Sequence, residues 1–164
     1  DGNLECRPSP KVLSFVSHVL DALPEVRDVA TTLKAVFIVR GEQTSNRKIR
    51  VPGYEFLLER VKNDPRARVV DLAEVGDVVE QMKLVRSARA LVGIHGAGLT
   101  HALWMRPDSF VLEVSTVFRC HCYRAIADFV GLTFETMEAL SREPEKLASA
   151  ALSRLGLGLN VDGV

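Results

Sequence analysis

The sequence has no excess of charge of either sign, and this absence narrows the classes of partner. Its 164 residues include 21 Lys and Arg against 21 Asp and Glu, so the formal net charge is zero. A nucleic-acid-binding domain usually carries a basic excess or a basic stripe, and we therefore expect no nucleic-acid partner. A small anionic ligand is compatible with this balance, because its site needs only a few local cations.

Cysteines are few as well, and long apolar runs are absent. Cys6, Cys120 and Cys122 are an odd number without the spacing of a disulfide framework, so they do not fix the redox compartment. Cys120-His121-Cys122 also lacks the C-x₂₋₄-C spacing of zinc sites, and we predict no metal site there. No apolar run approaches the roughly 20 residues of a membrane-spanning helix.

No signal peptide opens the chain, and it does not begin with Met. We interpret the chain as a processed or excised piece. Any membrane contact would then come through a missing upstream segment. With an apolar share of 47%, the sequence can bury a sizeable core and is not expected to be disordered. Its length fits one domain. We expect one domain over 1–164, with flexible ends at 1–8 and 157–164.

Uninterrupted apolar runs alternate with amphipathic segments along the whole chain. The runs are typical of strands buried on both faces of a parallel sheet, and the segments have the apolar spacing of helices. This alternation predicts an α/β fold with a doubly wound parallel sheet. We expect strands at 35–39, 68–72, 90–94, 110–114 and 132–136, and helices at 10–23, 54–61, 75–87, 98–105, 123–130 and 144–155.

A glycine-rich loop, Gly93-Ile94-His95-Gly96-Ala97-Gly98-Leu99-Thr100, joins a predicted strand to a predicted helix. Ligands of open α/β sheets bind at the carboxyl ends of strands, and the first amides of a helix favour an anion. A diphosphate fits this loop, with His95 and Thr100 as additional donors. We expect Gly96 or Gly98 at positive φ or at a close approach to the ligand, so that Gly98→Val removes nucleotide binding with little effect on the fold.

A second segment, 40–50, follows the first predicted strand and carries four cations. Arg40 comes directly after the strand, and a guanidinium group suits bidentate contact with phosphate. Because parallel neighbouring strands end at the same edge, we expect Arg40 and the glycine-rich loop to share one site.

Both loops also have simpler explanations. The two glycines can make a tight turn with His95 satisfied by a backbone carbonyl, and the loop cations can be solvated. The glycine spacing is not G-x-G-x-x-G, which disfavours a dinucleotide site.

The same segments resemble glycosyltransferase family 61. The resemblance runs from about Val36 to Phe134, and its most specific string is H-G-A-G-L-T. It is carried by Ile38-Val39-Arg40, Asn46-Arg47-Lys48-Ile49, Glu80-Gln81-Met82-Lys83-Leu84, the loop 93–100, Phe110-Val111-Leu112-Glu113-Val114, Tyr123 and Gly131-Leu132-Thr133-Phe134.

The resemblance implies the nucleotide-sugar-binding, Rossmann-like half of a GT-B enzyme. Such an enzyme transfers a sugar, with inversion, from a nucleotide sugar to a hydroxyl of a protein or polysaccharide. We expect the donor to be UDP-linked. The resemblance implies no metal or other cofactor. His95 is the candidate catalytic residue. The implied donor-binding residues are Arg40, Asn46, Arg47, Gln81, Gly96, Ala97, Gly98, Leu99, Thr100 and Glu113, with Glu113 holding ribose hydroxyls.

Two departures from the family pattern concern the acceptor and the sugar. Arg50-Val51 replaces Asn-Glu, and His101 replaces Asn. The N-terminal acceptor half is absent, so two alternatives stay open: a non-catalytic nucleotide-binding module or fragment, and a different α/β enzyme of phosphorylated metabolites. The expected compartment is the secretory lumen for a eukaryotic protein and the cytoplasm for a bacterial one.

Overall fold

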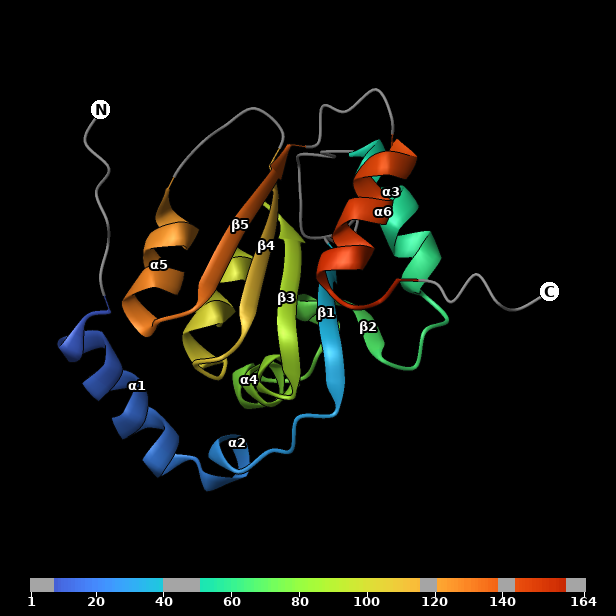
Figure 1. The fold of residues 1–164 in the computed structure, drawn as a ribbon. Coiled ribbons are helices and arrows are strands. Elements are labelled where there is room, and N and C mark those ends of the chain that lie inside the picture. Colours follow the sequence, from blue (N-terminus) through green and yellow to red (C-terminus); the bar gives the residue numbers. More distant parts are fainter. Residues whose placement is uncertain (1–7, 40–50, 116–120, 139–143, 159–164) are drawn as a thin grey trace, which may run out of the picture.

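A computed structural model of the chain describes residues 8–39, 51–115, 121–138 and 144–158. Its centre is one sheet of five parallel strands in the order β2-β1-β3-β4-β5 (Figure 1). The strands are β1 (Leu33–Val39), β2 (Ala67–Asp71), β3 (Ala88–Ile94), β4 (Phe110–Ser115) and β5 (Thr133–Glu138). All five lie at the positions predicted from the apolar runs, with shifts of one or two residues at their ends.

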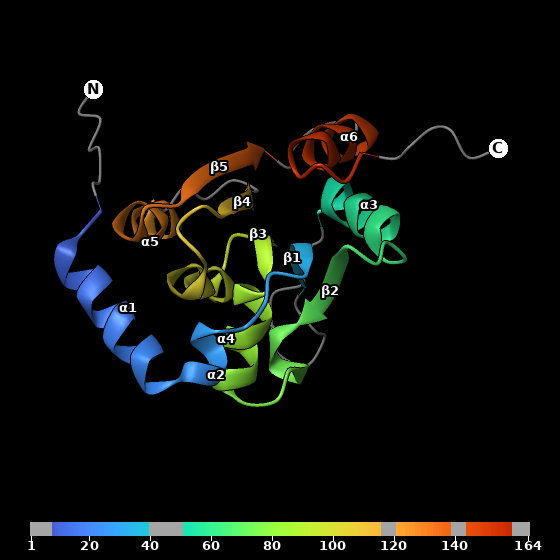
Figure 2. The ribbon, with the colours of Figure 1, turned by 60° about the horizontal axis from the view of Figure 1, so that its bottom comes forward.

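Helices cover both faces of the sheet (Figure 2). One face carries α3 (Pro52–Val61) and α6 (Pro144–Arg154), which pack against each other. The other face carries α1 (Pro10–Ala22), α2 (Pro24–Arg27), α4 (Val78–Arg86), α5 (Cys122–Val130) and a 3₁₀ helix, η2 (Ala97–Trp104). A second 3₁₀ helix, η1 (Leu72–Glu74), follows β2. The doubly wound parallel fold is therefore confirmed.

The alternation of side chains along each strand divides the core into two layers. In β1, Val36 and Ile38 pack under α4 and η2, whereas Ala35 and Phe37 pack under α3 and α6. All of these side chains are at most 9% exposed. This two-sided burial is the physical reason that the strands read as continuous apolar runs rather than as alternating ones.

Three local features differ from the sequence prediction or refine it. The helix expected from Val75 begins at Val78, because the Asp77 carboxylate caps it by accepting hydrogen bonds from the Val79 and Glu80 amides. Pro24 lies just past the end of α1 and begins the short helix α2. Gly131 ends α5 in the left-handed conformation, at φ 79°, which is usual for a glycine C-cap.

The C-terminal end departs from the expected flexible tail at one residue. Leu157 is 1% exposed and packs in the layer of α3 and α6, with its amide donating to the Leu152 carbonyl. Apolar burial therefore extends past the end of α6.

The strand order places a topological switch point between β1 and β3. From β1 the chain runs outward to β2 in one direction and, through β3, to β4 and β5 in the other. Tyr54 of α3 lies beneath this point. Its hydroxyl is 2.8 Å from the Ile38 carbonyl oxygen of β1 and 3.2 Å from the Val92 carbonyl oxygen of β3. Burial raises the pKa of this hydroxyl well above its ordinary value, so it stays a hydrogen-bond donor.

Tyr54→Phe should lower the free energy of unfolding by roughly 1–3 kcal/mol, because two buried carbonyls lose their shared donor while the apolar packing is kept. Urea unfolding of the variant and the parent, with similar m-values, measures this difference. A change within about 0.5 kcal/mol, the range typical of substitutions at sites without such a feature, would show that the carbonyls are satisfied without Tyr54.

Candidate functional site

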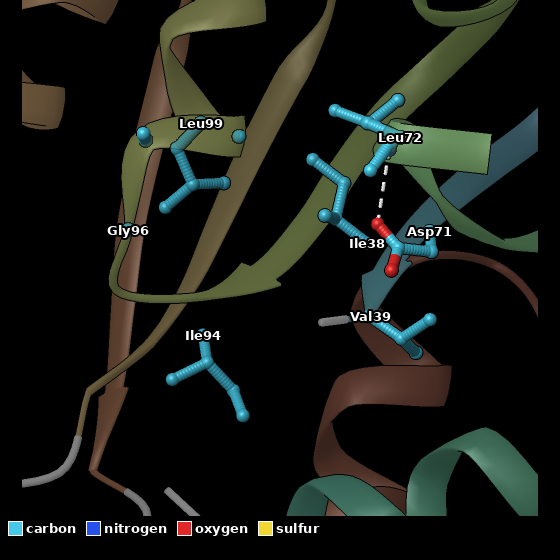
Figure 3. A pocket seen from close by; sticks show the side chains of 10 residues that line it. Ile38, Val39, Asp71, Leu72, Ile94, Gly96 and Leu99 are labelled. Atoms are coloured by element: carbon cyan, nitrogen blue, oxygen red, sulfur yellow. Dashed lines mark hydrogen bonds between the residues drawn. The ribbon is translucent and has the colours of Figure 1, made fainter. Parts of the chain in front are cut away.

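A pocket of about 270 Å³ opens at the carboxyl ends of β1, β2 and β3, at the switch point (Figure 3). Ligands of doubly wound sheets bind in this position, because the strand connections diverge there and leave a crevice. Its lining is mostly apolar and comes from three strand ends and the loops that follow them: Ile38, Val39, Asp71, Leu72, Ala73, Ile94, Gly96, Ala97, Gly98 and Leu99.

The glycine-rich loop forms one wall of this pocket. Gly96, Ala97, Gly98 and Leu99, four of the predicted donor-binding residues, all line it. The loop turns directly into η2, where the Leu99 amide donates to the Gly96 carbonyl at 2.9 Å. The preceding amides at the start of this helix have no carbonyl ahead of them within the helix and are suited to an anion.

Positive φ, one of the two reasons predicted for glycine in this loop, is found neither at Gly96 nor at Gly98. Gly96 has an extended backbone with φ 166°, and Gly98 is not among the glycines with positive φ. A Cβ atom at Gly98 would instead lie 3.0 Å from Cγ2 and 3.2 Å from Cδ1 of Ile38. The start of η2 therefore packs directly on β1, and a larger residue here disturbs the fold. This contact argues against the expectation that Gly98→Val affects the fold only a little.

Gln81 supports the opposite wall and does not line the pocket. Its side-chain amide donates to the Leu72 carbonyl at 2.9 Å and to the Val75 carbonyl at 3.3 Å. These bonds attach α4 to η1, whose residues Leu72 and Ala73 line the pocket. The geometry thus gives Gln81 a positioning role for the loop after β2.

His95 and Glu113 form a close pair on the sheet face covered by η2 and α5. His95 Nδ1 lies 2.6 Å from Glu113 Oε1, and the two side chains are 21% and 5% exposed. The Tyr123 ring packs edge-on against the imidazole, with ring centroids 4.9 Å apart. His95, which we expected at a backbone carbonyl in the simpler explanation, has a carboxylate as its partner.

The register of β3 and β4 brings this pair together. Gly93 is the residue opposite Glu113, so the side chain of Glu113 lies on the same face as His95, two residues further along β3. Diagonal neighbours of this kind are within reach of long side chains. The His95 amide, donating to the Val114 carbonyl at 3.2 Å, extends the ladder to this point.

The remaining predicted residues fall into two groups. Arg40, Asn46 and Arg47 lie outside the described residues, although Val39, which directly precedes Arg40, lines the pocket. Thr100 does not line it, and its hydroxyl donates to the Ala97 carbonyl at 2.7 Å within η2.

Asp71 is a pocket residue that the sequence reasoning missed. It ends β2, opposite Val39 of β1, and its carboxylate accepts a hydrogen bond from the Ala73 amide at 3.0 Å (Figure 3). A polar residue at the carboxyl end of a predicted strand was the available signal. Only the strand order, which places β2 beside β1, shows that this end belongs to the site.

Cys122, at the start of α5, is disulfide-bonded. Within the described ranges no group of three or more His, Cys, Asp or Glu side chains is arranged to hold a metal ion. No helix in the same ranges has the length and apolarity needed to cross a membrane.

The structure is a doubly wound α/β domain with a pocket at the switch point, and comparison with known proteins gives its family. The model of the family described as Glycosyltransferase 61 matches residues 5–112. The chain therefore belongs to the glycosyltransferase 61 family.

Two of the curated relatives that the chain matches are described here by name, and both are named as transferases. The chain is 29% identical over 136 residues to the EGF domain-specific O-linked N-acetylglucosamine transferase of Xenopus laevis, covering 81% of this chain and 26% of that protein. It is 30% identical over 70 residues to the beta-1,2-xylosyltransferase of Arabidopsis thaliana, covering 42% of this chain and 13% of that protein. The chain thus spans about a quarter of the first relative's length and less of the second's.

Among solved structures, a diflavin flavoprotein A3 from Nostoc sp. superposes with a TM-score of 0.53, covering 77% of this chain and 92% of that chain. At 18% sequence identity this likeness shows the fold alone. The strand order 2-1-3-4-5 found here is the flavodoxin-like variant of the doubly wound fold.

Gly98→Ala should destabilise the fold by roughly 1–3 kcal/mol, because its methyl group overpacks against Ile38. Gly158→Ala is the matched control, since a Cβ atom there meets nothing within 4 Å. Adding Ile38→Ala to Gly98→Ala should give a loss smaller than the sum of the two single losses. Chemical denaturation of the four variants measures these values, and full additivity would contradict the contact.

Proposed function

We propose that this chain is the nucleotide-sugar-binding half of a glycosyltransferase. It would bind a UDP-linked donor at the switch-point pocket, for transfer with inversion to a hydroxyl of a protein or polysaccharide. The observation that carries the proposal is the position of the glycine-rich loop: in a chain of this family, it forms a wall of the pocket at the carboxyl ends of β1 and β3.

The polarity of the pocket supports one orientation of the donor. On the β3 side lie the first amides of η2, which favour phosphate oxygens. On the β2 side lies the Asp71 carboxylate, which accepts hydrogen bonds and repels phosphate. The diphosphate therefore lies over the glycine-rich loop, and hydroxyl groups of the nucleoside lie toward Asp71 rather than toward Glu113, which is 5% exposed.

The size of the pocket suits part of the donor only. Its volume of about 270 Å³ is just below the range of about 300–1,000 Å³ usual for small-molecule sites. The donor sugar would project beyond the edge of the sheet, toward an acceptor held by other parts of a longer enzyme. The names of the relatives, one a transferase specific for EGF domains and one a xylosyltransferase, support a protein or glycan acceptor.

The charge of the diphosphate would be neutralised by Arg40 and Arg47 together with the helix amides, without a metal or other cofactor. Arg40 follows Val39, a residue of the pocket wall, directly in sequence. A chelator should accordingly leave the affinity for UDP unchanged.

Arg40→Ala should weaken UDP binding by roughly ten- to a hundredfold, because it removes a charge-assisted contact with phosphate. Binding of uridine, which has no phosphate, should be nearly unchanged, and Arg40→Lys should restore only part of the loss. Isothermal titration at low and moderate salt measures these affinities.

Equal losses for uridine and UDP would assign Arg40 to the fold instead of the ligand. A parent chain that binds no nucleoside diphosphate would favour an α/β enzyme of other phosphorylated metabolites. UDP binding without sugar transfer by the longer enzyme would leave a nucleotide-binding module.

The disulfide at Cys122 favours the secretory lumen as the compartment, since disulfides persist in oxidising environments. The sequence contains three cysteines, so an intrachain disulfide leaves one free thiol. Denatured protein should incorporate one alkyl group without reductant and three after reduction, as counted by intact mass. Three without reductant, in protein made under oxidising conditions, would contradict the assignment.

A further inference from the structure

Asp71 carries the one ionisable side chain among the ten described residues that line the pocket. It ends β2, and its register partner is Val39, which also lines the pocket, so the side chains of the two residues lie on the same face of the sheet. Figure 3 shows the carboxylate directed toward Ile38 and Val39 of β1. A charge is thus placed in a lining that is otherwise mostly apolar.

The local turn does not account for this charge. The carboxylate accepts a hydrogen bond from the Ala73 amide, two residues further on, at 3.0 Å, which is the bond of an Asx turn. Asn makes the same turn, and Ser makes a weaker version of it, so the bond requires no charge. Because a carboxylate has about four acceptor positions, it can hold this turn and accept hydrogen bonds from a ligand at the same time.

The position of Asp71 matches the ribose of a nucleotide whose diphosphate lies over the glycine-rich loop. This loop follows β3, Asp71 ends β2, and β1 lies between the two strands, so about 10 Å separates them across two strand spacings. A nucleotide with its phosphates at the first amides of η2 has its ribose over the end of β1. The ribose hydroxyls then lie on the β2 side, where a carboxylate accepts from hydroxyl donors and repels phosphate.

We propose that Asp71 is a specificity-determining residue that selects ribonucleotides against deoxyribonucleotides. Its carboxylate accepts hydrogen bonds from the 2′- and 3′-hydroxyls of the ribose. The inference rests on the proposed function, because it takes the diphosphate of a nucleotide sugar to lie over the glycine-rich loop. A site built to bind a hydroxyl group discriminates strongly against an analogue that lacks it, since the acceptor in the protein then loses its partner.

The affinities of the parent chain for UDP, 2′-deoxy-UDP and 2′,3′-dideoxy-UDP, measured by isothermal titration, test the selection. We expect 2′-deoxy-UDP to bind roughly ten- to a hundredfold more weakly than UDP, because it lacks a hydrogen bond to a charged acceptor. The dideoxy nucleotide should bind more weakly still. Equal affinities for the three nucleotides would overturn the inference and leave the proposed function intact. A parent that binds none of them would contradict the proposed function itself, and the inference with it.

Asp71→Asn tests whether this residue is responsible. Asn keeps an oxygen for the Ala73 amide, so the turn is retained, and it removes the charge. The variant should bind UDP roughly ten- to a hundredfold more weakly than the parent. It should bind 2′,3′-dideoxy-UDP as tightly as the parent or more tightly, because only the repulsion between carboxylate and diphosphate is lost. A purely structural role would weaken both ligands alike, and that result, or undiminished UDP binding, would overturn the inference.

Glu74→Gln is the charge-matched control. Glu74 lies on η1, is exposed, and is not among the residues that line the pocket, so this variant should bind all three nucleotides like the parent. A last titration repeats the comparison of the parent with Asp71→Asn in the presence of a chelator, and we expect the difference in UDP affinity to persist. A carboxylate that held the diphosphate through a divalent cation would lose its effect there. Equal UDP affinities of the parent and Asp71→Asn in the chelator would therefore overturn the inference.

Discussion

The parallel pairing of β1 with β3 is the constraint on which the rest of the structure depends. These strands adjoin in the sheet although β2 lies between them in sequence, so the chain has to leave β1 in one direction and continue from β3 in the other. The crevice that results is a consequence of topology and needs no dedicated residue. Residues are needed to keep the two strand ends together: the Tyr54 hydroxyl spans their carbonyls from one face, and Gly98 allows η2 to close on Ile38 from the other.

On the other side of β3, the register with β4 brings His95, the candidate catalytic residue, to Glu113. A glycine within a strand usually weakens a sheet, yet Gly93, which lies opposite Glu113, allows Leu99 to pack closely on β3. A Cβ atom at Gly93 would lie 3.3 Å from Cδ2 of Leu99. Gly93 and Gly98 therefore act through packing, and the left-handed backbone that glycine permits is used elsewhere, at Gly131.

How far the sequence predicts this molecule depends on the range of the interactions. The five strands were predictable because a run such as Ala35 to Val39 can be satisfied only by burial on both faces. The position of the glycine-rich loop at a pocket was predictable because the crevices of open α/β sheets lie at the carboxyl ends of the strands. The first residues of helices were less predictable. Val75 has the apolar spacing of α4, but the Asp77 cap decides where the helix begins. The contacts of Gln81 with η1 and of Glu113 with His95 depend on tertiary geometry and strand register, neither of which a single sequence encodes visibly. The resemblance named both as donor-binding residues and did not give their partners within the protein.

The end of β3 joins these two parts of the site within three consecutive residues. Ile94 packs toward the layer of α3 and α6 and lines the pocket, and Gly96 lines it from the loop. His95, between them, points to the opposite face and meets Glu113. Because side chains alternate along an extended backbone, one strand end supplies both a wall of the pocket and the imidazole that pairs with Glu113. A shift of the loop would move both together, so the shape of the pocket and the orientation of His95 are coupled by the backbone itself. The close packing of Gly98 on Ile38, which fixes the start of η2 on β1, therefore bears on the position of His95 as well as on the pocket.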